Sequence, residues 1–260
     1  ILEFGVELPS GADDRDLPVE VETCYSLAPG ARHIVMDTTI RNMETEDIPV
    51  YMTEYLNGSG QVEFFQPYAG FGEPVFTASC PEQTYVACDA REDGLCDQCN
   101  FIAYSGIDGA AGVSYGLIHS EQSSSSFSTA GINILVYGAA VLDLILLIEP
   151  PNYTLPAEDV LSFRRYFAVG DGTVASIADI RNELFGIDTV EVHGVVSSDG
   201  QALEQAQVAV YQVFDDQTDP PTLFMVNHTR TDADAAYRLS LPPGDYEIRA
   251  KIEGYPNPVS

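Results

Sequence analysis

Apolar and polar residues alternate along most of this chain, which is the period of a β-strand. Turn sequences, such as Ala-Pro-Gly-Ala at 28–31 and Asn-Gly-Ser-Gly at 57–60, separate the alternating segments. No long helical pattern joins them, so the pattern predicts an antiparallel sandwich rather than β-α-β units. The predicted strands of the first part of the chain are 2–8, 19–27, 33–40, 50–56, 61–65, 101–104 and 113–119.

One segment has the period of a helix. Residues 174–185 carry apolar side chains at three-to-four spacing, with Thr173 suited to cap the start and Gly186 suited to end it. The strand pattern begins again directly afterwards. We therefore predict two domains, 1–187 and 188–260, linked by this short helix.

The most apolar stretch, 132–148, does not fit a membrane span. It has 17 residues, contains Asn133 and Asp143, and has Gly138 near its middle. A spanning helix needs about 20 apolar residues. Two buried strands around the bend at 138–140 fit the pattern better, and no membrane insertion is expected.

The last part of the chain resembles the carboxypeptidase regulatory-like domain. Its motif residues are Gly194, Val195, Val196, Gly200, Leu203, Ala206, Val208 and Val210, then Thr229, Thr231, Asp232, Asp234, Tyr237, Leu239, Leu241, Pro243, Gly244, Tyr246, Gly254 and Tyr255. The resemblance implies a seven-stranded prealbumin-like sandwich that has no catalytic residues and accompanies another domain. Ala235 departs from the family, which usually has a turn glycine there, so that turn is expected to be altered.

The first part resembles galactose-mutarotase-like supersandwich domains. The segment that carries the resemblance, TCYSLAPGARHIVMDTTIRN, spans residues 23–42, and FFQPYAGFG, GVSYGLIH and LPAEDVLSFRRYFAVGDGTVASI also fit. A supersandwich joined to a regulatory-like domain is similar to the N-terminal half of secreted PHP-type metallohydrolases. This resemblance implies that a catalytic domain follows Ser260. The chain begins at Ile1 rather than Met, and we interpret it as a processed piece of a longer secreted or cell-surface protein.

The charge narrows the range of partners. Asp and Glu total 40 and Lys and Arg total 11, which gives a net charge of -29. This charge repels phosphate backbones and anionic lipid surfaces, so nucleic acid is excluded as a partner and a membrane surface is disfavoured. The expected partners are the C-terminal domain of the same full-length chain and, as an alternative, carbohydrate.

Four cysteines lie in an acidic loop, 80–99. We predict that Cys80, Cys88, Cys96 and Cys99 form two disulfides, whose pairing the sequence does not determine. A Cys₄ zinc knuckle remains the alternative, with redox chemistry as a third possibility. Cys24, on a strand with apolar neighbours in alternation, is predicted to be a buried free thiol.

Catalytic motifs are absent from the sequence: it contains no P-loop, GxGxxG or H-E-x-x-H, and no catalytic or cofactor-binding residues are assigned. Mutarotase chemistry would need two His and a Glu, and His33, His119 and Glu54 are the candidates. A carbohydrate site could use aromatic side chains, although these more often form core. The aromatic candidates are Tyr51, Tyr55, Phe64, Phe65, Tyr68 and Phe71.

Acidic clusters offer only weak cation sites. None has the register of a calcium loop, and chance clusters are expected among 40 acids, so we predict no cofactor, with a structural Ca²⁺ as the alternative. The clusters are Asp215, Asp216 and Asp219, then Asp232 and Asp234, and Glu92 and Asp93. The chain is therefore expected to be a non-catalytic accessory region of a larger protein, with a carbohydrate-binding or mutarotase-like protein as the alternative.

Overall fold

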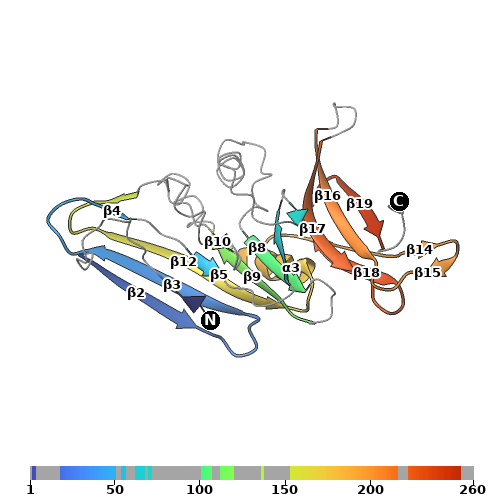
Figure 1. Ribbon diagram of the computed structural model, residues 1–260, viewed down its shortest axis with the longest axis horizontal. Helices are drawn as coiled ribbons and strands as arrows, with labels where there is room; N and C mark the ends of the chain where they lie inside the picture. The colour runs from blue at the N-terminus through green and yellow to red at the C-terminus, as the bar shows by residue number, and fades with distance from the viewer. Residues whose placement is uncertain are drawn as a thin grey trace. The chain divides into compact units, whose positions relative to one another are not determined.

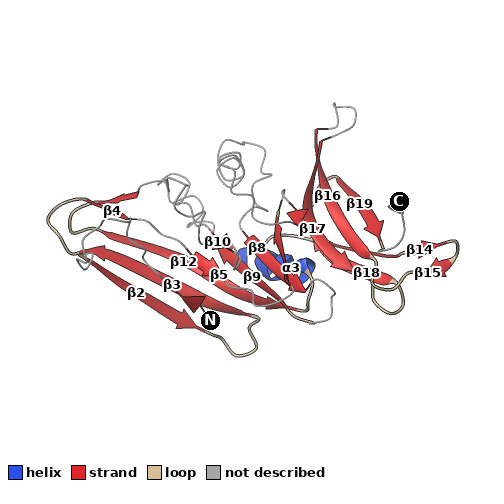
Figure 2. Cartoon of the chain, in the orientation of Figure 1, coloured by secondary structure: helices blue, strands red, loops and turns tan. Residues whose placement is uncertain are grey.

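The computed structural model describes residues 2–3, 18–50, 54–56, 62–67, 70–71, 101–106, 112–119, 136–137, 153–215 and 222–252 (Figure 1). Strands dominate this part of the chain, and the helix α3 (Val174–Phe185) is its one helix (Figure 2). The predicted all-β class with one short helix is confirmed. No helix among these residues is long and apolar enough to cross a membrane, and of the apolar stretch 132–148 only β10 (Val136–Tyr137) is described.

The chain divides into two compact units. Unit 1 comprises Ile1–Gly60, Glu73–Asn100 and His119–Phe167, and unit 2 comprises Gln61–Gly72, Phe101–Ile118 and Ala168–Ser260. Unit 2 thus contains the helix and two earlier segments together with the residues after 188. That 188–260 forms a domain of its own stays a prediction.

Unit 1 is built around a long hairpin, in which β2 and β3 pair antiparallel along all eight residues of β2. The turn between them closes as predicted, with Ala31 N donating to Ala28 O over 3.1 Å. β5 pairs antiparallel with β1 but parallel with β10, which departs from the expected all-antiparallel pattern. The strands of this unit are β1 (Leu2–Glu3), β2 (Val19–Ser26), β3 (His33–Asn42), β4 (Ile48–Val50), β5 (Glu54–Leu56), β10, β11 (Tyr153–Leu155) and most of β12 (Val160–Gly170).

Alternation along β3 separates a buried face from an open one. Met36 and Ile40 point into the core, and Asn42, on the same face, is also buried. The Asn42 amide donates to the carbonyls of Leu155 (3.1 Å) and Pro156 (2.9 Å), and the hydrogen bond to Leu155 is buried, so it satisfies an acceptor inside the core. The asparagine of the TTIRN motif is thus a structural residue.

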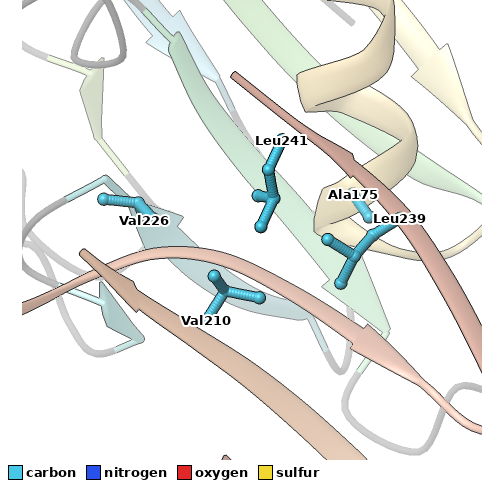
Figure 3. Close-up of a cluster of buried hydrophobic side chains, with 5 residues drawn as sticks. All are labelled: Ala175, Val210, Val226, Leu239 and Leu241. Atoms are coloured by element: carbon cyan, nitrogen blue, oxygen red, sulfur yellow. The ribbon is translucent and has the colours of Figure 1, made fainter. Parts of the chain in front are cut away.

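Unit 2 contains a sandwich of two small antiparallel sheets. One sheet has the order β17-β16-β19, and the other pairs β13 with β18. Val210, Val226, Leu239 and Leu241 form a core to which the helix contributes Ala175 (Figure 3). The strands are β6 (Val62–Gln66), β7 (Gly70–Phe71), β8 (Phe101–Gly106), β9 (Ser114–His119), of which His119 falls in unit 1, β13 (Val190–Val195), β14 (Ser197–Ser198), β15 (Gln201–Ala202), β16 (Gln207–Asp215), β17 (Thr222–Arg230), β18 (Ala236–Leu241) and β19 (Tyr246–Lys251).

The helix begins and ends where the sequence predicted. The Thr173 hydroxyl accepts a hydrogen bond from Ser176 N (3.2 Å), and Gly186 takes the left-handed conformation with φ 62°. The helix also lies close against β9, since a Cβ on Gly116 would stand 2.3 Å from Ile177 Cγ2. Glycine at 116 is therefore required by this contact.

Two turns in the C-terminal part contain residues with a left-handed backbone conformation. Asp199 and Gly200 connect β14 to β15 with φ values of 50° and 77°. Ala235 has φ 57°, a left-handed conformation that favours glycine, and its side chain is fully buried. The turn thus keeps a backbone conformation that favours glycine although residue 235 is alanine.

Candidate functional site

The four loop cysteines, Cys80, Cys88, Cys96 and Cys99, lie outside the described residues, so their disulfides stay a prediction. Within the described part of the chain, no group of three or more His, Cys, Asp or Glu side chains is placed to hold a metal ion. The acids at 92, 93, 216 and 219 also lie outside it, as does the side chain of Asp215.

Cys24 is a free thiol, but the prediction that it is buried is wrong: it is exposed. The physical reason is its place on β2, where it stands opposite Asp37 on the open face of the hairpin. Alternation in the sequence showed that residue 24 belongs to one of two faces. It could not show that this face is uncovered.

Of the three candidates for mutarotase chemistry, only His33 has its side chain among the described residues. His33 lies on β3, whereas for Glu54 and His119 the structure describes only the strand backbones. The mutarotase-like alternative therefore stays a prediction.

Two of the six aromatic candidates have described side chains, and both lie in unit 2. Phe65 is fully buried and packs edge-on against Phe71, with ring centroids 5.2 Å apart, and stacks on Phe101 at 6.4 Å. Phe71 in turn meets the ring of His228 at 4.7 Å. The expectation that these aromatics form core is confirmed for Phe65, whereas Phe71 is only partly buried. The side chains of Tyr51, Tyr55, Phe64 and Tyr68 lie outside the described residues.

The acidic turn at 232–236 has an intramolecular role. One carboxylate oxygen of Asp232 accepts hydrogen bonds from Asp234 N (2.9 Å) and Ala236 N (3.0 Å). This is the bonding of an Asx turn, which explains the aspartate at 232 without a cation.

A group of polar side chains collects on the open face of β3 and of the part of β12 that belongs to unit 1. Arg164 donates two hydrogen bonds to Asp37, from Nε to Oδ1 (2.6 Å) and from Nη2 to Oδ2 (2.8 Å). Both side chains are about half exposed. The hydrogen bonds from Arg164 lower the pKa of Asp37, and bonding to Asp37 raises the pKa of Arg164. Asp37 is thus held as a carboxylate at neutral pH.

The same face carries two aromatic rings and two hydroxyls. The ring of His33 meets Tyr166 edge-on, with centroids 5.7 Å apart. Tyr166 also hydrogen-bonds to Arg164, which joins the rings to the ion pair. On the other side of the pair, the hydroxyls of Thr39 and Ser162 lie 3.2 Å apart. We refer to His33, Asp37, Thr39, Ser162, Arg164 and Tyr166 as the polar face.

Sequence reasoning missed the polar face, apart from His33. Asp37 and Arg164 are 127 positions apart, and nothing local marks either one. The detectable signal was that Asp37 occupies the more polar set of alternate positions on the predicted strand 33–40, whereas no strand was predicted around Arg164. Their pairing depends on the register of two strands that are distant in sequence, and alternation does not supply that register.

His228 is the other unusual group, and it lies in the core of unit 2. It is 5% exposed, and its Nε2 has no hydrogen-bond partner among the described residues. Burial is the main cause that lowers the pKa of His228 to about 3, and the positive charge of Arg230 adds to it. The imidazole is therefore neutral at physiological pH and acts as a packing group beside Phe71.

Comparison with known proteins gives little help. No protein-family model matches this chain, and no curated protein matches it. A solved structure of a polysaccharide lyase aligns with a TM-score of 0.30 and 9% sequence identity, over 94% of this chain. The alignment covers 34% of that lyase, so this chain spans about a third of its length.

Proposed function

We propose that this chain is a non-catalytic accessory region of a larger secreted or cell-surface protein, such as a metallohydrolase, and that its polar face binds carbohydrate. The polar face is the observation that carries the proposal. It combines a hydrogen-bond acceptor, the Asp37 carboxylate, with a planar donor, the Arg164 guanidinium, and the aromatic ring of Tyr166 on adjacent strands.

The chemistry of the polar face suits sugar hydroxyls. The Asp37 carboxylate accepts hydrogen bonds and the Arg164 guanidinium donates them, so together they complement neighbouring hydroxyls on one ring. Tyr166 adds an apolar ring face with a polar tip, which fits the mixed surface of a sugar. A net charge of -29 favours a neutral glycan over a polyanionic one.

The pKa of Asp37 favours binding over acid catalysis. A general acid near neutral pH needs a raised carboxyl pKa, and hydrogen bonding to Arg164 moves the pKa of Asp37 the other way. A permanently charged carboxylate with a fixed partner is better suited to orient a ligand than to transfer a proton.

A glycan array followed by titration calorimetry tests the proposal. Tyr166→Ala and Arg164→Ala should each raise the Kd for the neutral glycans that the wild type binds. The expected increase is about tenfold or more, which is the loss of affinity that removing one good polar or aromatic contact causes. Tyr211→Ala is the matched control, because Tyr211 is a partly buried aromatic of unit 2 that packs against Arg249. Wild-type protein that binds no neutral, acidic or amino sugar would contradict the proposal.

A further inference from the structure

β2 forms an uncovered edge in the described part of the chain. It stands at the end of its sheet order, and among the described strands it pairs only with β3. An edge strand presents a row of backbone donors and acceptors that another strand can pair with. At eight residues, β2 is long for an edge, and it contains no proline and no lysine.

The side chains of β2 form two stripes of different character. Val21 and Tyr25 lie on the apolar stripe and are 52% and 49% exposed, and Leu27, one residue beyond the strand, is 64% exposed. The opposite stripe is polar and consists of Glu20, Glu22, Cys24 and Ser26. Exposed apolar residues in a row along an edge are typical of a surface that pairs with another chain.

We propose that this edge pairs with the β2 edge of a second copy of the chain, antiparallel, about a two-fold axis at Thr23. The observation behind this is that the residues around Thr23 have a palindromic pattern of apolar and polar character. The resulting pairs are Val19 with Leu27, Glu20 with Ser26, Val21 with Tyr25, and Glu22 with Cys24. Every pair joins two apolar residues or two polar residues, and no two charges of the same sign stand directly opposite each other.

Other registers of the same pairing are poorer. A two-fold axis at Glu22 would place Glu22 opposite its own copy, and directly opposed like charges are destabilising. An axis at Cys24 would leave only 22–26 of β2 paired, whereas an axis at Thr23 pairs 20–26. The axis at Thr23 therefore gives the longest pairing without opposed charges.

A second copy of the chain fits this edge better than a basic peptide does, because the polar stripe carries few charges. A cationic strand would gain from Glu20 and Glu22, but only these two of the four polar-stripe residues carry charge. The two arrangements respond oppositely to salt. Two chains of net charge -29 repel each other, so screening strengthens self-association, whereas it weakens an acid–base contact.

The pairing would also have a functional consequence. A two-fold axis through an antiparallel strand pair stands perpendicular to the sheet, so the same face of both copies points to the same side. Asp37 is opposite Cys24 on that face. Two polar faces would thus lie side by side and could engage a repeating polymer together.

Cross-linking tests the register directly. In a Cys24→Ser background, Thr23→Cys places two thiols opposite each other across the axis, where Cβ atoms stand about 4.5–5.5 Å apart and a disulfide needs only a small adjustment. Mild oxidation should then give a covalent dimer on non-reducing gels. The Val21→Cys variant in the same background is the matched control, because its partner is Tyr25, and it should stay uncrosslinked. Equal cross-linking of both variants would overturn the register.

Analytical ultracentrifugation tests the dimer itself, with the full chain in a concentration series at low and molar sodium chloride. Dimer formation should strengthen with salt. Tyr25→Asp should weaken it by at least about tenfold, because each substitution counts twice across the axis. Val195→Asp, at a valine on β13 that is more exposed than Tyr25, should leave dimer formation unchanged. A wild-type chain that stays monomeric throughout, or a dimer that survives Tyr25→Asp, would overturn the proposal.

Discussion

His228 shows how one side chain couples this fold to pH. The pKa of the folded-state imidazole is about 3, whereas an exposed histidine in the unfolded chain titrates near 6.5. Between these values the unfolded chain binds the proton and the folded chain does not. The stabilisation by neutral His228 is therefore complete above pH 6.5 and is lost as the pH falls towards 3.

We expect His228→Gln to remove this part of the pH dependence. The free energy of unfolding of the wild type, measured in urea, should fall by about 1–2 kcal/mol more than that of the variant between pH about 7 and about 5. The magnitude follows from 1.36 kcal/mol for each pH unit over which only the unfolded histidine is protonated. The comparison with the variant matters because protonation of carboxylates also relieves repulsion in a chain of net charge -29. Parallel pH profiles for the two proteins would show that His228 titrates normally.

The roles of residues that depend on local sequence could be predicted, whereas the roles of residues that depend on strand register could not. The capping roles of Thr173 and Gly186 and the turn at 28–31 follow from local chemistry, and the structure confirms them. The exposure of Cys24 and the Asp37–Arg164 pair depend on which strands are neighbours and which face is covered. A single sequence carries no local trace of either fact.

At the scale of elements, alternation identified the strands well but gave their boundaries and partners less well. The predicted strands 19–27 and 33–40 correspond to β2 and β3 within two residues. The strand predicted over 50–56 contributes instead to two sheets, through β4 and β5. Strand partners depend on tertiary packing, which periodicity along one chain does not contain.

The helix belongs to the core of unit 2, where Ala175 packs with Val210 and Leu239. A fragment of residues 168–260 should therefore unfold at a higher temperature than 189–260, because the shorter fragment leaves this apolar surface in water. Calorimetry of the two fragments measures the difference in melting temperature. In the full chain, Ala175→Ser should likewise lower the melting temperature. Equal melting temperatures would instead support an independent domain from residue 188, as the sequence predicted.

At the scale of the whole molecule, charge is the dominant feature. The chain has 40 acidic and 11 basic residues, so even complete ion pairing would leave 29 carboxylates without a partner. The ion pairs on its surface are modest in energy, since pairs such as Asp37 with Arg164 are half exposed. Repulsion among unpaired acids therefore outweighs surface pairing.

We accordingly expect the melting temperature to rise between low salt and molar sodium chloride. Screening over a Debye length of about 10 Å at 0.1 M shortens the range of the repulsion, and it acts more on the compact state, where the charges are closest. Self-association would raise the melting temperature too, so Tyr25→Asp serves as a monomeric control and should show most of the same rise at low protein concentration. Differential scanning calorimetry in sodium chloride measures both proteins. A melting temperature that falls with salt in both would mean that local ion pairs, rather than the net charge of -29, decide how stability responds to salt.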